Sequence, residues 1–287
     1  MRRGAGQSLC VGVGASGVSL VRSGGWRGTG ATLLAEQSFL PGERSHEGIG
    51  PALRALFSGH EHAGWPVSFV LDDALARLWQ VTPPPGAAHL ADLEAAAALR
   101  FELLYGEGPG AWSMTAGWDA VQPFFAAAVP RTLLAVLNDS AQEHGLAVVG
   151  IAPHFISAWN RWCCALKPGA WFGLMHDKTL CIGATDGGRL CAVRVVSLLA
   201  LPPSAAQEWL TGVVTREALL LGLAAPTLLQ LCGQVPAGLR QAGANPAHIA
   251  SVALGAEKNG ALRQSDGLRQ TLGLSPAGWL AHSGSGA

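Results

Sequence analysis

The fold is decided by the stretch Leu9-Cys-Val-Gly-Val-Gly-Ala-Ser-Gly-Val-Ser-Leu-Val21, in which two apolar runs flank a short turn of glycine, alanine and serine. This pattern predicts two strands, 9–13 and 17–22, joined at Gly14-Ala-Ser16, because glycine enters tight turns without steric cost. A second hairpin is predicted from a strand at 179–184, a turn at Thr185-Asp-Gly-Gly188 and a strand at 190–197. Each hairpin opens one half of the chain, so the sequence predicts two related halves.

The predicted elements follow the same order in both halves. Three strands, a helix and a further strand are predicted across 9–71 and again across 171–232, from apolar runs and from apolar residues at helical spacing. This order suits a mixed sheet with a helix on one face. Lys167-Pro-Gly169 is the predicted boundary, which gives a first domain over 1–168 and a second over 169–287.

Other segments do not belong to this repeat. Residues 78–120 combine a strand, three prolines and a strongly periodic helix, so we predict a small subdomain inserted between two core strands, the second of them at 123–129. Short helices are expected at 237–242 and 246–254. The tail from Ser275 to Ala287 is expected to be frayed.

Composition excludes several classes of protein. Of 287 residues, 49% are hydrophobic and 13% are charged, so a folded chain is expected. The formal net charge is zero and Lys and Arg form no run, which argues against a nucleic acid or an anionic membrane held by bulk charge. The six cysteines form no C-x-x-C pair, as expected in a reducing cytosol. No apolar run reaches the ~18 residues that span a bilayer, and a secretory signal is not expected.

The two turns are the candidate binding site. Gly12, Gly14, Ser16 and Gly17 could hold a phosphate through backbone N–H groups, as could Asp186-Gly-Gly188 in the second hairpin. Neither turn matches the P-loop or the dinucleotide fingerprint. From the residues alone, plain hairpin turns explain both stretches more simply.

Few side chains offer other chemistry. His60-Glu-His62 could contact a metal, but no second cluster of ligands accompanies it, and we predict no metal site. Asp72 and Asp73 follow a buried strand, where catalytic acids often lie, although capping of a following helical turn accounts for them equally well. Cys163-Cys164 is expected to belong to the core. No catalytic residue is predicted.

Residues 9–21 resemble the first phosphate hairpin of the actin-like ATPase fold, and more specifically that of PilM-type proteins of type IV pilus machines. In that family the hairpin tends to run apolar-Gly-Ile-Asp-Ile-Gly-Ser-x-Ser-Val-Lys-Leu-Val. In this chain Cys10 stands at the first Gly, Gly12 at the Asp, Gly14 at the last Gly, Ser16 in the polar turn and Ser19 at the Lys. The acid and the base of the pattern are thus both replaced.

Three more segments carry the same resemblance. They are the Leu78-Trp-Gln-Val-Thr-Pro-Pro strand with its Ala-rich helix, the Phe125-Ala-Ala-Ala-Val-Pro-Arg131 strand and helix start, and Ile249-Ala-Ser-Val-Ala-Leu-Gly255. The hairpin at 171–194 is similar to those of MshI-like and GspL-like relatives, which belong to MSHA-type pili and type II secretion. GspL-like proteins carry a membrane span after this domain, and this chain has no such apolar run.

The resemblance implies an α/β fold of the actin-like (RNase H-like) two-lobed ATPase type, with the insertion at 78–120 and a degenerate nucleotide site. It implies a cytoplasmic scaffold of a pilus or type II secretion platform, peripheral to the inner membrane, which binds the N-terminal segment of a membrane-anchored, PilN-like partner through a groove in the first lobe. ATP and Mg²⁺ would bind weakly or not at all, because both hairpins lack the acids that hold a metal–phosphate complex. A second copy of the chain, in a homodimer, is a further candidate partner.

Two other functions stay open. The chain could be a working ATPase or a sugar-kinase-like phosphotransferase of the same fold, for which Asp72, Asp73 and Asp186 are the available carboxylates. It could also be a paralogue with an unrelated protein-binding role. Neighbouring genes that encode pilins and small single-span proteins would argue against this third function.

Overall fold

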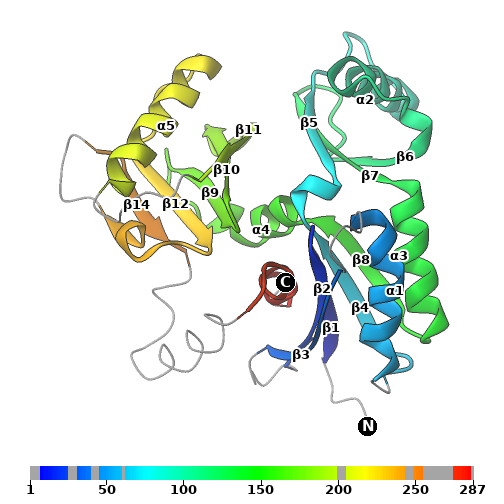
Figure 1. Cartoon of the computed structure of the whole chain (residues 1–287). Helices are drawn as coiled ribbons and strands as arrows, with labels where there is room; N and C mark the ends of the chain where they lie inside the picture. The colour runs from blue at the N-terminus through cyan, green and yellow to red at the C-terminus, as the bar shows by residue number, and fades with distance from the viewer. Residues whose placement is uncertain are drawn as a thin grey trace. The chain divides into compact units, whose positions relative to one another are not determined.

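The computed structural model describes residues 7–24, 31–39, 45–59, 62–198, 205–242, 248–254 and 274–285. The chain divides into two compact units (Figure 1). Unit 1 comprises Met1–Ser157 and Leu274–Ala287, and unit 2 comprises Ala158–Gly273. This division differs from the predicted 1–168 and 169–287. Helix α4 (His154–Trp162) runs through the boundary without a turn, and the C-terminal residues pack on the first sheet.

A five-stranded sheet forms the centre of unit 1. Its strand order is β3-β2-β1-β4-β8. β1 runs antiparallel to β2 and parallel to β4, so the sheet is mixed, as predicted. The strands are β1 (Ser8–Val13), β2 (Gly17–Ser23), β3 (Thr32–Ser38), β4 (Pro66–Leu71) and β8 (Ala147–Pro153).

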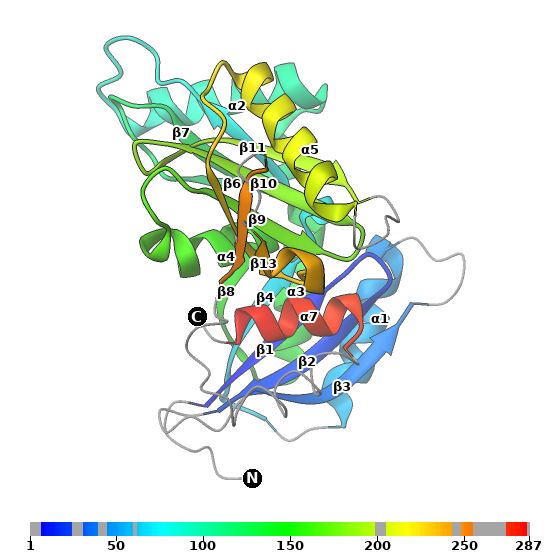
Figure 2. The same ribbon diagram turned by 90° about the vertical axis from the view of Figure 1, so that its left-hand side faces the viewer.

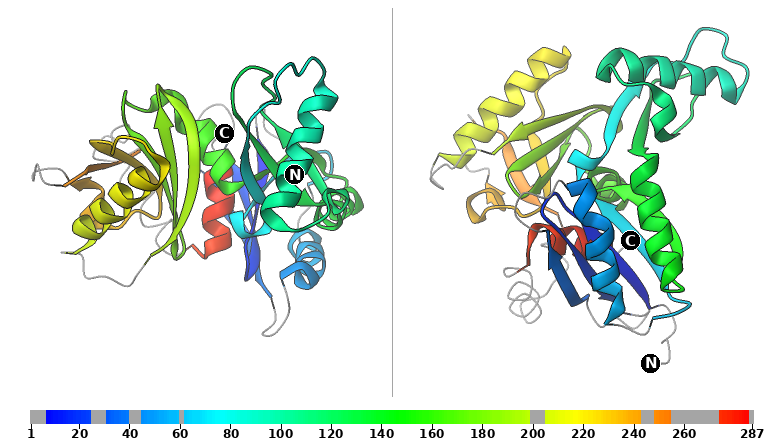
Figure 3. Two further views of the ribbon diagram at one scale, coloured as in Figure 1. Left: turned by 90° about the horizontal axis from the view of Figure 1, so that it is seen from above. Right: turned by 45° about the vertical axis from the view of Figure 1, so that its right-hand side comes forward.

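The two faces of this sheet are covered by different helices. Residues Leu9, Val11 and Val13 of β1 are buried in a core with helices α1 (Ser45–Ser58) and α3 (Arg131–Glu143). The alternate residues, Cys10 and Gly12, face the other way, because successive side chains of a strand point to opposite faces. On that face the helix α7 (Pro276–Gly284) lies across β1 and β2 (Figure 2). Viewed from above, the sheet lies between α7 and α1 (Figure 3, left).

The prediction of a frayed tail was wrong. Ala277, Leu280 and Ala281 of α7 are buried, with Leu280 and Ala281 fully so. Ser275 accepts a hydrogen bond from the backbone N–H of Gly278 and therefore caps the helix, and Pro276 occupies its first turn. A serine followed by proline is a helix-start signal. In the sequence this signal is weak, because the segment after it is short and contains glycine.

The elements between β4 and α3 form a small subdomain of their own, which extends beyond the 78–120 of the sequence prediction. It is a three-stranded sheet with order β5-β7-β6, and α2 covers one face of it. The strand predicted at 123–129 as part of the main sheet is the central strand of this small one, because it pairs with β5 and β6. The elements are β5 (Arg77–Val81), α2 (Leu90–Tyr105), β6 (Trp112–Ala116) and β7 (Phe124–Pro130).

Unit 2 repeats the order of unit 1. Three strands, the helix α5 (Ala206–Leu221) and a further strand follow one another as predicted, and the sheet has the order β11-β10-β9-β12-β14-β13. The segment predicted as a helix at 246–254 contains instead a strand, Ala250–Ala253, which is parallel to β12. The strands are β9 (Trp171–His176), β10 (Thr179–Asp186), β11 (Arg189–Ser197), β12 (Leu228–Gly233), β13 (Gln241–Ala242) and β14 (Ala250–Ala253).

In the part of the chain that the structure describes, these elements are connected by four short 3₁₀ helices: η1 (Asp73–Leu75), η2 (Pro109–Ala111), η3 (Cys163–Ala165) and η4 (Ala237–Leu239). Among the described residues, no helix has the length and apolar character required to cross a bilayer.

Candidate functional site

The first hairpin uses several of its backbone groups internally. The Gly14 N–H donates to the carbonyl of Gly17 over 2.9 Å, and the Ser16 carbonyl accepts from the N–H of Phe39 over 2.9 Å. Gly17 is buried against β3, where a Cβ would lie 2.6 Å from the carbonyl oxygen of Gln37. Strand pairing therefore accounts for Gly17, the N–H of Gly14 is used within the turn, and Ser16 is exposed at the tip. The Gly14 amide is not left over for a phosphate.

Gly12 has a different explanation, which involves α7. A Cβ at this position would overlap the carbonyl oxygen of Ala277 and lie 2.5 Å from the backbone nitrogen of Ala281. Real Cβ atoms essentially never approach backbone atoms that closely. The helix thus rests directly on the backbone of β1, and any side chain at position 12 would displace it. In particular, an aspartate could not occupy this position while α7 stays in place.

Hydrogen bonds to one carboxylate hold the first turn of α7 on the sheet. Glu36 of β3 accepts from the hydroxyl of Ser19 over 2.8 Å and from the hydroxyl of Ser275 over 2.6 Å. The Ser19 side chain, which stands at the lysine of the family pattern, is fully buried. Hydrogen bonds to a charged group contribute about 1.5–3 kcal/mol each. The position of the expected base therefore ties β2 to β3 and to the end of α7.

The other end of α7 is equally close to the sheet. A Cβ at Gly284 would overlap the side chain of Val70 and lie 2.6 Å from the sulfur of Cys10. Cys10, Val70 and Leu280 form a small apolar cluster under the helix. Burial raises the pKa of the Cys10 thiol to about 12, so this cysteine behaves as a packed apolar group. Burial likewise raises the pKa of Cys232 in unit 2 to about 12.

The second hairpin is a tight turn. Gly187 and Gly188 have φ of 56° and 81°, and two successive positive φ angles are typical of a type I′ turn. Asp186 of β10 lies opposite Arg189 of β11 in the strand register at the end of the hairpin, and Asp186 is exposed. A Cβ at either glycine would meet nothing within 4 Å. Turn geometry alone therefore accounts for Asp186-Gly-Gly188, and this hairpin lies in unit 2 whereas the first lies in unit 1.

The acids proposed for catalysis cap helices. The Asp72 carboxylate accepts from the N–H of Ala74 over 2.9 Å and caps the 3₁₀ helix η1, as the N-cap interpretation predicts. The Asp73 carboxylate accepts from the N–H of Phe155 over 3.0 Å, at the start of α4. Carboxylates at helix starts satisfy unpaired N–H groups and oppose the helix dipole. Both acids therefore have structural roles.

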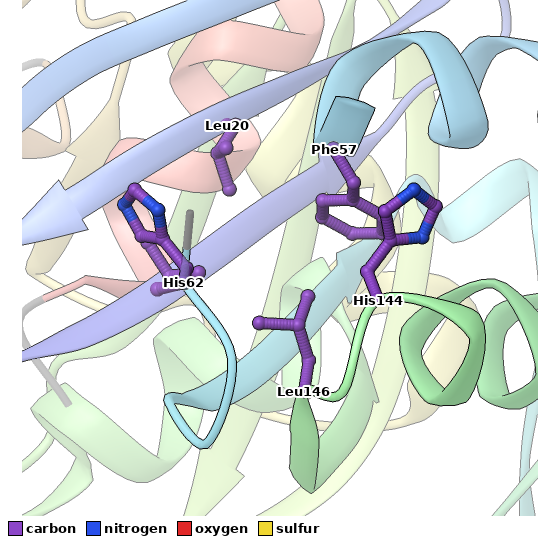
Figure 4. Close-up of a pocket in the computed structure, with 6 residues that line it drawn as sticks. Leu20, Phe57, His62, His144 and Leu146 are labelled. Atoms are coloured by element: carbon purple, nitrogen blue, oxygen red, sulfur yellow. The ribbon is translucent and has the colours of Figure 1, made fainter. Parts of the chain in front are cut away.

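A small apolar pocket lies on the α1 side of the sheet, away from Gly12. Leu9, Leu20, Phe57, His62, His144 and Leu146 line it. Figure 4 shows His62 and His144 on opposite sides of Leu146. The His144 ring lies 5.4 Å from Phe57, and the His62 ring lies 4.7 Å from Trp65. The pocket has room for about one water molecule at most, and its lining is largely apolar. It is therefore too small and too apolar to bind a nucleotide.

Of the residues in the metal hypothesis at His60-Glu-His62, His60 and Glu61 lie outside the described residues. Among the residues that the structure describes, no group of three His, Cys, Asp or Glu side chains could hold a metal ion. Cys163 and Cys164, expected in the core, lie at the end of α4 and are respectively half-buried and exposed.

No protein-family model and no curated protein sequence matches the chain. Solved structures do match. The cytoplasmic domain of EpsL, an inner membrane component of the type II secretion system of Vibrio cholerae, aligns with a TM-score of 0.53 and 14% identity, over 80% of this chain and 83% of that one. The PilM–PilN type IV pilus biogenesis complex contains a chain with a TM-score of 0.55 and 17% identity, over 81% and 82%.

A third match carries the name of the fold. A Bacteroides thetaiotaomicron protein of unknown function with an actin-like ATPase fold has a TM-score of 0.53 and 10% identity, over 81% of this chain and 84% of that one. Likenesses at such identities show the fold alone. The predicted resemblance to PilM-like and GspL-like proteins is confirmed at that level: this chain has the actin-like ATPase fold.

Proposed function

We propose that the chain is a non-catalytic scaffold of an inner-membrane assembly platform, in an MSHA-like type IV pilus or a type II secretion system. The proposal draws on the shared fold with the EpsL domain and with the PilM–PilN complex. In this role it lies in the cytoplasm and is peripheral to the inner membrane. It attaches there through the N-terminal segment of a membrane-anchored, PilN-like partner.

The observation that carries the non-catalytic part is the contact between α7 and Gly12. The family pattern places a metal-binding acid at this position, and the backbone of Ala277 and Ala281 fills the space that its side chain would need. Catalysis of phosphoryl transfer depends on metal ions that neutralise the developing charge. A hairpin without its acid therefore lacks a main ligand for the metal ion. We therefore propose that binding of Mg-ATP is weak or lost.

The alternative, an active ATPase or sugar-kinase-like phosphotransferase, needs a carboxylate free to hold a metal or to act as a base. Asp72 and Asp73 each accept hydrogen bonds from helix N–H groups, and Asp186 lies on an exposed turn. These observations favour the scaffold.

The partner is tested with peptides. Synthetic peptides should cover the cytoplasmic N-terminal segments of single-span membrane proteins encoded beside this chain, and fluorescence anisotropy should measure their binding to the full chain. We expect one of them to bind with a dissociation constant on the order of micromolar, and its scrambled version not to bind. If no neighbouring gene encodes such a protein, or if native and scrambled peptides behave alike, the scaffold proposal is contradicted.

A further inference from the structure

The C-terminal end of α5 exposes apolar side chains to solvent. Leu219 and Leu220 are 80% and 69% exposed. The segment Ala218-Leu-Leu-Leu-Gly-Leu-Ala-Ala-Pro226 contains no charged residue, and Ala224 and Ala225 are exposed beside the two leucines. Single exposed leucines are common on protein surfaces, whereas a contiguous exposed group marks a contact surface. We call residues 219–225 the α5 tip.

The fold of unit 2 does not account for Leu219 and Leu220. The buried apolar side chains of α5 are those of Leu210, Val213, Val214 and Ala218, and Leu221 packs against the same core at its edge. Leu223, just beyond the helix, also packs on this core. The two exposed leucines lie on the opposite side of the helix, so their apolar surface stays in water unless another surface covers it.

The backbone of the α5 tip is prepared for a dry environment. Gly222 has a φ of 65° and its N–H donates to the carbonyls of Ala218 and Leu219. The N–H of Leu223 also donates to the carbonyl of Ala218, over 3.0 Å. This pattern is a Schellman motif, which satisfies carbonyls that otherwise need water at a helix end. Burial of the tip in an apolar phase therefore costs less than burial of an open helix end.

The charges beside the α5 tip are basic. The Arg216 side chain, one turn before Leu219 and Leu220, is 60% exposed, and that of Arg194 on β11 is 47% exposed. Both pair with Glu217, whose side chain is only 8% exposed, so this group of three carries a net positive charge at the surface. Residues 158–273 contain ten Lys or Arg and six Asp or Glu, a formal charge of +4 that the zero net charge of the whole chain conceals.

We propose that the α5 tip is a membrane contact, in which Leu219 and Leu220 enter the interface of an anionic lipid bilayer and Arg216 and Arg194 lie against its headgroups. Apolar side chains flanked by basic ones are the usual composition of such contacts. Two leucines and two arginines provide reversible binding, which becomes useful when a protein partner supplies a second attachment. The contact deepens the proposed function, since a scaffold at the inner membrane meets anionic lipid, but it requires no partner protein.

A second exposed apolar helix face supplies the matched control. Leu99 and Leu103 of α2 are 61% and 70% exposed. The exposed charges on the same helix are Glu94, Glu102 and Arg100, so its carboxylates outnumber its one exposed basic side chain. Because anionic headgroups repel these carboxylates, the α2 leucines are not expected to enter an anionic bilayer.

The test is sedimentation of the full chain with vesicles. We expect binding to vesicles of phosphatidylglycerol and phosphatidylethanolamine, and little binding to vesicles of phosphatidylcholine alone. Leu219→Ser with Leu220→Ser should lower the bound fraction about tenfold, and Arg216→Gln about fivefold. Leu99→Ser with Leu103→Ser should leave the bound fraction unchanged. Salt at 0.5 M reduces the Debye length to under about 5 Å and should therefore weaken vesicle binding of the native chain.

The proposal is overturned if the native chain stays in the supernatant, if neutral vesicles bind it equally, or if the α2 and α5 variants behave alike. A different outcome would make the tip a contact between two copies of the chain. In that case the native chain does not bind vesicles, and light scattering without vesicles shows a native dimer that the α5 variant loses. This outcome would also overturn the membrane proposal. The peptide assay of the proposed function is run without vesicles, so it can fail or succeed independently.

Discussion

Gly12→Ala is expected to lower the free energy of unfolding by about 3 kcal/mol, an unusually large effect for the addition of one methyl group. The new Cβ would overlap the carbonyl of Ala277 and the backbone of Ala281, neither of which can rotate away. Helix α7 must then shift or detach, which exposes Leu280 and the cluster that it forms with Cys10 and Val70. Urea denaturation gives the stability, and hydrogen exchange at the amides of α7 reports its release.

Gly14→Ala is the matched control for this change. Its Cβ would lie 3.4 Å from the Gly17 carbonyl and 3.6 Å from the Cβ of Ala277, which are ordinary contact distances. We expect a change below about 1 kcal/mol and no faster exchange in α7. Equal destabilisation by the two substitutions would show that the hairpin, and not the helix above it, requires glycine.

Phe101→Ala is expected to destabilise the inserted subdomain by about 4 kcal/mol. The Phe101 ring is fully buried and lies 5.2 Å from the ring of Trp79 and 5.4 Å from that of Trp112. Only Leu93, Ala97 and Phe101 of α2 are buried, so this ring is the largest attachment of the helix to its sheet. Tryptophan fluorescence during urea denaturation should therefore report an earlier transition for the variant.

Leu103→Ala, on the same helix, is the control. Its side chain is 70% exposed, and we expect a shift within about 0.5 kcal/mol. A comparable loss of stability in both variants would contradict the view that burial of Phe101 against the sheet holds α2 in place.

Much of the fold was predictable because it is encoded locally. The hairpins at 9–21 and 179–197 follow from apolar runs interrupted by glycine, and the helix ending at Gly106 follows from its periodicity and its left-handed cap. The repeated order of elements followed from these local patterns, and the resemblance of residues 9–21 to the PilM-type hairpin implied the fold that the solved structures confirm.

The errors concern pairing over long distances in the chain. Residues 124–130 have the apolar pattern of a buried strand in any sheet, so the sequence could not show that they pair with β5 and β6. Residues 250–253 were mistaken for a helix because so short a run has no clear period. The α7 helix packs on a sheet formed by the first residues of the chain, and nothing local to 276–284 reveals that contact.

The candidate site was understood only in part for the same reason. The sequence showed that Gly12 stands where the family pattern has an acid, but it offered no physical reason for a glycine. The structure supplies one, since the helix that requires it comes from the other end of the chain. Glu36, which binds Ser19 and the cap of α7, carried no sequence signal at all.

The central claim is that this actin-like fold does not use Mg-ATP, because α7 occupies the space that the acid of the first hairpin would need. Isothermal titration calorimetry of the full chain with Mg-ATP, followed by an assay for released phosphate in the same samples, tests it most directly. The account predicts no binding heat up to about 1 mM nucleotide and no phosphate release. Micromolar binding accompanied by steady release of phosphate would contradict it.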